Sequence, residues 1–145
     1  MIKIGRQEDI SLLAELAALL WEQDSPQELE EDLAGIMAKE DACFFLYYEQ
    51  EIPVGFAQCQ LRHDYVEGTQ ASPVGYLEGV FVREEFRRRG YAGELLRACE
   101  RWAADKGCRE FASDCELDNE DSRRFHMAMA FCEANPIICF TKELV

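Results

Sequence analysis

The stretch that decides the fold runs from Val80 to Leu96 and reads VFVREEFRRRGYAGELL. Its first residues have the character of a strand that ends at Val82, and its last ones begin an apolar helical period that continues to about Lys106. Between them lie three consecutive arginines and Gly90. A helix that starts just beyond a strand offers free backbone amides to an anion, and glycine lets a phosphate approach closely. The junction therefore indicates an anion site, although its spacing is neither a nucleotide P-loop nor a dinucleotide fingerprint.

Composition limits what this anion can be. The chain has 145 residues, 48% of them hydrophobic, and a net charge of -14, so we expect one domain over residues 1–145. An acidic protein with one local basic run is a poor nucleic-acid binder and favours cationic partners. No stretch predicts a leader peptide or a membrane span, so we expect a cytoplasmic protein without membrane contact. Seven cysteines without a C-x-x-C pair are typical of small buried residues in a reducing compartment.

Strand and helix patterns alternate along the rest of the chain. Asp9 is expected to cap a first helix and Ser25 a second, which begins with Pro26 and has Glu28 three residues after the cap. The pattern predicts a further helix over 118–131 and strands over 1–6, 42–49, 53–62, 76–82, 109–115, 131–135 and 137–144. This order predicts an α/β fold: a mixed, mostly antiparallel sheet with a central strand–helix–strand crossover, flanked by helices.

Few residues offer reactive side chains. The only histidines are His63 and His126, so a cysteine–histidine nucleophile is disfavoured, and no ligand spacing predicts a metal site. Glu78 is an acid within an otherwise apolar strand, where an inward carboxylate would be costly without a function or a partner. Strand alternation leaves open whether Glu78 faces inward or simply faces solvent.

Two motifs resemble those of the GNAT superfamily of N-acetyltransferases. The pattern [QR]-x-x-G-x-[GA] at a helix start is matched by Arg87, Gly90 and Ala92. A second pattern near the C-terminus is met by Asn119, Ser122, Phe125, His126 and Phe131. Within that superfamily the chain looks like the aminoglycoside 6′-N-acetyltransferases, through the blocks RHDYVEG, SPVGYLEGVFV, KGCREFASD and LDN.

The resemblance implies a single GNAT domain that transfers acetyl from acetyl-CoA to the 6′-amino group of an aminoglycoside and confers resistance. It implies no metal, a homodimer and a coenzyme site formed by Val80, Phe81, Val82, Arg88, Arg89, Gly90, Tyr91, Ala92, Gly93, Glu94 and Asn119. It places the antibiotic against Trp21, Tyr65, Glu78 and Asp114.

Glu78 is our candidate base, with the amine attacking directly in a ternary complex. His126 stands where the superfamily commonly presents a tyrosine, and it either protonates the thiolate or only packs beside the coenzyme. An acyl-enzyme on Cys115 is conceivable but less favoured. Gly79 would permit a local bulge that opens backbone amides to the thioester carbonyl.

Two departures and two other functions stay open. Ala130 replaces a glycine of the second motif, which matters if that residue needs a positive φ. Asn135 stands where relatives carry an acid that faces the substrate, and Glu133 lies close by in the sequence. The alternatives to the aminoglycoside enzyme are a GNAT enzyme for another amine, such as a polyamine or a protein N-terminus, and a non-catalytic acyl-CoA-binding module.

Overall fold

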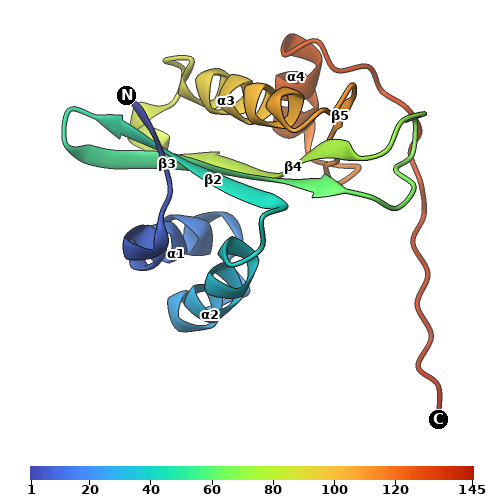
Figure 1. The fold of residues 1–145 in the computed structure, drawn as a ribbon, viewed down its shortest axis with the longest axis horizontal. Coiled ribbons are helices and arrows are strands. Elements are labelled where there is room, and N and C mark those ends of the chain that lie inside the picture. The colour runs from blue at the N-terminus through green and yellow to red at the C-terminus, as the bar shows by residue number, and fades with distance from the viewer.

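A five-stranded sheet lies between two helical layers in the computed structural model, which describes residues 1–145 (Figure 1). Its strands follow one another across the sheet in chain order: β1 (Ile2–Ile4), β2 (Ala42–Glu49), β3 (Ile52–Arg62), β4 (Val74–Val82) and β5 (Phe111–Ala112). Neighbouring strands are antiparallel except β4 and β5, which are parallel. The predicted α/β class with a mixed, mostly antiparallel sheet is therefore confirmed.

The helices divide between the two faces of the sheet. They are the short 3₁₀ turns η1 (Gln7–Asp9) and η2 (Glu84–Phe86) and the helices α1 (Ile10–Leu20), α2 (Pro26–Met37), α3 (Tyr91–Asp105) and α4 (Glu120–Ala128). Figure 1 shows α1 and α2 below the sheet and α3 and α4 above it. Helix α3 connects β4 to β5 and forms the predicted crossover. None of the helices has the length and apolar character that crossing a membrane requires.

Local signals set several helix ends. Ser25 Oγ accepts a hydrogen bond from the amide of Glu28 at 3.2 Å, so the predicted cap of α2 is confirmed. Gly107 follows α3 with φ +94°, the left-handed backbone that favours glycine after a helix. The predicted side-chain cap by Asp9 is wrong, because its carboxylate instead accepts from the amide of Arg6 at 2.9 Å and closes the η1 turn.

Two apolar cores hold the layers together. The core on the α3 side includes Val54, Leu77, Val82, Leu95, Leu96 and Cys99. The core on the α1 and α2 side includes Leu13, Leu16, Leu29, Leu33, Phe44 and Phe56. Phe44 and Phe45, neighbours on β2, belong to opposite cores, as strand alternation requires.

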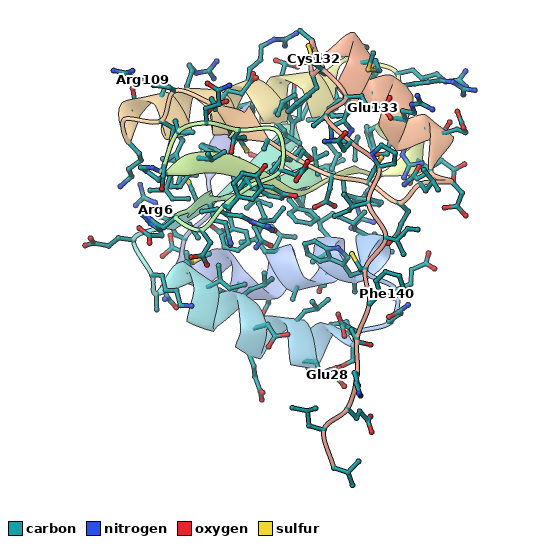
Figure 2. The ribbon with its side chains drawn as sticks, turned by 90° about the vertical axis from the view of Figure 1, so that its right-hand side faces the viewer. Arg6, Glu28, Arg109, Cys132, Glu133 and Phe140 are labelled. Carbon is teal, nitrogen blue, oxygen red and sulfur yellow. The ribbon has the colours of Figure 1, made fainter.

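The C-terminal third differs most from the prediction. The strand expected over 109–115 shortens to Phe111–Ala112, the helix over 118–131 to Glu120–Ala128, and 131–135 and 137–144 form no strand. A strand exists only where a neighbour receives its backbone hydrogen bonds, and these two segments have no such neighbour within the chain. Figure 1 shows this tail leaving the molecule beyond α4, and Figure 2 follows it from Cys132 and Glu133 to Phe140.

The expectation of buried cysteines is correct for only part of the set. Cys59 and Cys99 are buried, while three of the seven free thiols are exposed: Cys115, Cys132 and Cys139. The exposed ones follow β5 or lie in the tail, where apolar sequence does not pack into a core.

Candidate functional site

The loop before α3 has the free helix N-terminus that the sequence predicts for an anion site. Gly90 is the N-cap of α3 with φ +82°, and a Cβ built there would meet nothing within 4 Å, so the space above it is open. The first intrahelical bond runs from the amide of Glu94 to the Gly90 carbonyl. The amides of Tyr91, Ala92 and Gly93 therefore have no partner in the chain and carry the positive end of the helix dipole.

The three arginines before Gly90 have different partners. Arg87 Nε donates to the Val82 carbonyl at 2.8 Å and so fastens the loop to the end of β4. Arg89 Nη1 donates to both carboxylate oxygens of Glu49, at 2.7 and 2.9 Å. Arg88 has a positive φ of 64° and forms no hydrogen bond or ion pair within the protein. Of the two arginines expected at the coenzyme, only Arg88 is therefore free to meet an anion without breaking a contact.

Two other residues of the expected coenzyme set also contact the sheet. Tyr91 stacks on Tyr47 with ring centroids 4.1 Å apart and donates its hydroxyl to Glu49 at 2.9 Å. Glu94 accepts from the Tyr47 hydroxyl at 2.9 Å. Burial, with the Glu94 carboxylate as a second cause, raises the pKa of Tyr47 to about 12. These contacts hold the first turn of α3 on the sheet, while its backbone amides stay free.

Strand β4 has an open edge beside this cradle. β5 pairs with it only at Gly75 and Tyr76, so the β5 side of Val80–Val82 has no neighbouring strand. Because the amide of Arg83 donates to Val54 on β3, alternation turns the backbone groups of Val80 and Val82 toward the open edge. The structure thus brings the expected pantetheine edge and the phosphate cradle together at one end of β4.

A bulge interrupts β4 directly before this edge. Leu77 pairs with Cys59 and Gly79 with Gln58, so Glu78 has no partner on β3. A Cβ on Gly79 would lie 2.7 Å from Trp21 Cζ2, so the indole packs directly on the bare backbone of the bulge. The bulge suggested by Gly79 is confirmed, and Trp21 packs against the residue that follows Glu78.

The acids expected at the antibiotic lie in one small network. Arg62 donates from Nε and Nη2 to the two oxygens of Glu78, at 3.0 and 2.8 Å. The guanidinium carbon of Arg62 stands 3.5 Å from the centroid of the Tyr76 ring, and the Tyr76 hydroxyl donates to Asp114. The hydrogen bond to Glu78 raises the pKa of Arg62, so it stays charged. Burial, with Asp114 next, raises the pKa of the Tyr76 phenol.

Sequence reasoning missed Arg62 and Tyr76. Both lie in blocks that resemble the aminoglycoside enzymes, and Arg62 is the last residue of β3 opposite the start of β4. Pairing of the two predicted strands could have placed Arg62 near Glu78, but the register depends on the bulge.

Tyr65 lies apart from this network. Its side chain is on the surface, 77% of the residue is exposed, and its hydroxyl is 3.4 Å from Glu67 in the same loop. Asn135 Nδ2 also donates to Glu67, at 2.6 Å, which ties the start of the tail to that loop. Tyr65 and Trp21, which are both expected to line the antibiotic site, have no contact with each other.

Helix α4 supplies the remaining expected residues. The side chain of Asn119 accepts from the amide of Ser122 at 3.1 Å and caps the helix. His126 Nδ1 lies 2.7 Å from the Ser122 carbonyl, which places its proton there, and Nε2 lies 2.8 Å from Ser113 Oγ. Both ring nitrogens therefore have protein partners, and a bound thiol would have to compete with Ser113 for Nε2. No group of three or more potential metal ligands converges anywhere in the protein.

Comparison with known proteins agrees with this geometry. The sequence profile of the acetyltransferase (GNAT) family matches residues 10–131. The chain belongs to the GNAT acetyltransferase family. The family resemblance carried by the two sequence motifs is thereby confirmed, and the free amides of Tyr91 and Ala92 in this GNAT protein lie within the first of them.

Curated relatives and solved structures narrow the similarity. This GNAT chain is 34% identical to aminoglycoside N(6′)-acetyltransferase type 1 of Serratia marcescens, covering 99% of both chains. It is 41% identical to the protein of that name from Salmonella typhimurium over 74% of each chain. The structure of AAC(6′)-Iy with the bisubstrate analogue CoA-S-monomethyl-acetylneamine matches with a TM-score of 0.95 at 34% identity, covering 99% of this chain and 98% of that one. AAC(6′)-IG from Acinetobacter haemolyticus, without ligand, matches with a TM-score of 0.94 at 34% identity, over 100% and 99% of the two chains.

Proposed function

We propose that this protein transfers an acetyl group from acetyl-CoA to the 6′-amino group of aminoglycosides and so confers resistance to them. The observation that carries the proposal is the sequence of features along β4: Glu78 sits in the bulge, and the open edge of Val80–Val82 follows at once. An acid for the amine and free amides for the thioester thus lie within a few residues of one strand. The names of the relatives support the choice of acceptor.

The proposed chemistry assigns a role to each part of this strand. The pyrophosphate binds the free amides of Tyr91–Gly93 with Arg88, and the pantetheine arm runs along Val80–Val82. The amide of Val80 polarises the thioester carbonyl, and the amine attacks it directly. Glu78 receives the amine proton, directly or through a water. The thiolate leaves with a proton from solvent, or from the imidazolium form of His126, whose Nε2 also carries a proton, after Ser113 moves.

The proposed acceptor is a polycation held by acids and aromatic faces. Glu78 and Asp114 are the carboxylates of the network, and Trp21 packs on the bulge beside them. A cation is attracted both by carboxylates and by the face of an indole. In this proposal the exposed loop that carries Tyr65 moves when the acceptor binds, so that the Tyr65 ring also contacts the acceptor.

A steady-state acetyl-transfer assay tests the acceptor. We expect turnover of kanamycin and none of an analogue whose 6′-amine is replaced by a hydroxyl. Equal turnover of the two would refute the 6′ assignment. Faster turnover of spermidine or of a peptide N-terminus would identify a GNAT enzyme for another amine. Coenzyme binding without transfer to any amine would identify a non-catalytic module.

The coenzyme cradle has a matched pair of variants. Gly90→Val forces a branched side chain onto a left-handed backbone in the open space where the phosphate is proposed to bind. Gly107→Val imposes the same conformational cost in open space at the other end of α3. We expect both to lower stability, but only Gly90→Val to raise the KM for acetyl-CoA. An equal KM in the two variants would contradict the cradle.

We also propose a cytoplasmic homodimer in which a second copy covers the C-terminal tail. Apolar side chains of the tail are largely exposed: Ile137, Ile138, Phe140 and Leu144 are 67%, 79%, 89% and 91% exposed. An apolar, strand-prone segment without a partner is typical of a surface buried by association. Light scattering on the wild-type protein should give twice the mass of one chain. The double variant with Ile138→Asp and Phe140→Asp should give the mass of a single chain. A wild-type monomer would contradict the dimer.

A further inference from the structure

Arg62 contacts both Glu78 and Tyr76, although neither sequence motif includes it. Its guanidinium forms a two-point pair with Glu78, at 2.8 and 3.0 Å, and lies flat on the Tyr76 ring at 3.5 Å. A two-point pair fixes both the position and the rotation of a carboxylate, which one ammonium could not do. Arg62 thus controls where the Glu78 oxygens point.

Arg62 also connects the two acids of the network. The ring on which it lies belongs to Tyr76, whose hydroxyl donates to one oxygen of Asp114, while the other oxygen of Asp114 has no partner in the protein. Asp114 is exposed, whereas the Glu78 side chain is only 17% exposed. The two carboxylates therefore differ: one is fixed by Arg62 inside the bulge, and one keeps an oxygen free toward solvent.

We propose that Arg62 is a positioning residue for acetyl transfer, which holds the Glu78 carboxylate and the Tyr76 ring in place while a cationic acceptor binds at Asp114. This rests on the proposed function. Arg62 touches neither substrate and acts through Glu78 and Tyr76. It remains paired with Glu78 during binding, because the acceptor ammonium finds the unoccupied oxygen of Asp114 without displacing it.

A structural explanation of the same pair makes a different prediction. The pair joins β3 to β4, but the two strands are already joined by a ladder from Gly55 to Arg62. The Arg62 side chain is 38% exposed, and ion pairs at that exposure add little to stability. If the pair were only structural, its loss would lower the melting temperature slightly and leave kinetic constants unchanged.

The test uses the full chain and the amine that the wild-type protein acetylates fastest, so failure of the aminoglycoside proposal leaves this measurement intact. We expect Arg62→Leu to lower kcat about 100-fold, because a displaced carboxylate is costly for the reaction. Arg62→Lys keeps the charge but loses the two-point pair, so we expect about a 10-fold loss. The KM for acetyl-CoA should stay unchanged in both. The control is Lys3→Gln, which removes a surface charge that lies over the Tyr48 ring at 5.1 Å, and its kcat should match the wild type.

A double variant separates action through Glu78 from a general effect. If Arg62 acts through Glu78, then adding Arg62→Leu to Glu78→Gln should lower kcat by much less than the about 100-fold seen in the wild-type background. Independent effects would multiply, and that result would overturn the proposal. A kcat of Arg62→Leu equal to that of Lys3→Gln would overturn it too. So would a parallel rise in the KM for acetyl-CoA with a lowered melting temperature, since that pattern marks a general structural defect.

Discussion

Ala130 has an unfavourable backbone conformation, and a single substitution should remove its energetic cost. It follows α4 with φ +70°, and the two bonds that end the helix run from Ala130 N to Met127 O and from Phe131 N to His126 O. This is a Schellman ending, which places its C′ residue in the left-handed region that favours glycine. Alanine there keeps the turn but has an unfavourable backbone. Ala130→Gly should therefore stabilise the protein.

The magnitude follows from two opposing terms. A left-handed backbone costs a residue with a Cβ roughly 1–2 kcal/mol. Glycine loses more freedom on folding, which costs roughly 0.5–1 kcal/mol relative to alanine. The free energy of unfolding should therefore rise by about 0.5–1 kcal/mol. At this chain length each kcal/mol raises the melting temperature by roughly 2–4 °C.

Thermal and urea unfolding at one fixed protein concentration measure the effect. The matched control is Ala128→Gly, two residues earlier at an exposed helical position, where glycine should cost up to about 1 kcal/mol. The two alanine-to-glycine changes should thus move stability in opposite directions. A lower or unchanged melting temperature for Ala130→Gly would refute the assignment of strain to this turn.

Three further outcomes follow from contacts elsewhere. Gly79→Ala places a Cβ 2.7 Å from Trp21 Cζ2, so steady-state assays should show weaker acceptor turnover with an unchanged KM for acetyl-CoA. The pKa of Tyr47 is raised to about 12 from an ordinary 10, so its contribution to stability is complete below pH 10 and is lost as the pH rises through 12; an ultraviolet titration should show late phenols, Tyr47 and Tyr76 among them, after the exposed ones. In the native state, maleimide should spare Cys59 and Cys99 and label the exposed thiols Cys115, Cys132 and Cys139. Titration of Tyr47 together with the exposed phenols, or equal labelling of all thiols, would contradict the burial of these side chains.

Local signals in the sequence were sufficient for the strand–loop–helix junction at which we propose that the coenzyme binds. A strand that ends at Val82, a glycine and a helical period specify the cradle without any distant contact, and Ser25 specifies the start of α2 in the same way. Gly79 also gave a local hint of the bulge that the register of β3 and β4 confirms. Each of these depends on residues within a few positions of one another, which is why the sequence predicts them.

Features that depend on distant pairing were missed. The contact of Arg62 with Glu78 requires the register of two strands and a bulge that shifts it by one residue. The strand expected over 137–144 has the right composition, but a strand needs a neighbour and the single chain supplies none. Asp9 was missed for a local reason instead, because the amide of Arg6, three residues earlier, donates to its carboxylate. In each case the local preference is present and the partner decides the outcome.

In the proposed reaction, the one bulge in β4 positions groups for both substrates. If β3 and β4 paired regularly without the bulge, strict alternation would put Glu78 and Gly79 on opposite faces of the sheet. The shift of register instead leaves Gly79 against Trp21 on the α1 side, while Val80 and Val82 join the α3 core. The same shift turns the amide of Val80 toward the open edge. In the proposed reaction, the bulge therefore sets both the position of the acid and the direction of the Val80 amide, and with them the distance between the amine and the thioester. A variant that restores regular pairing here should lose both contacts together.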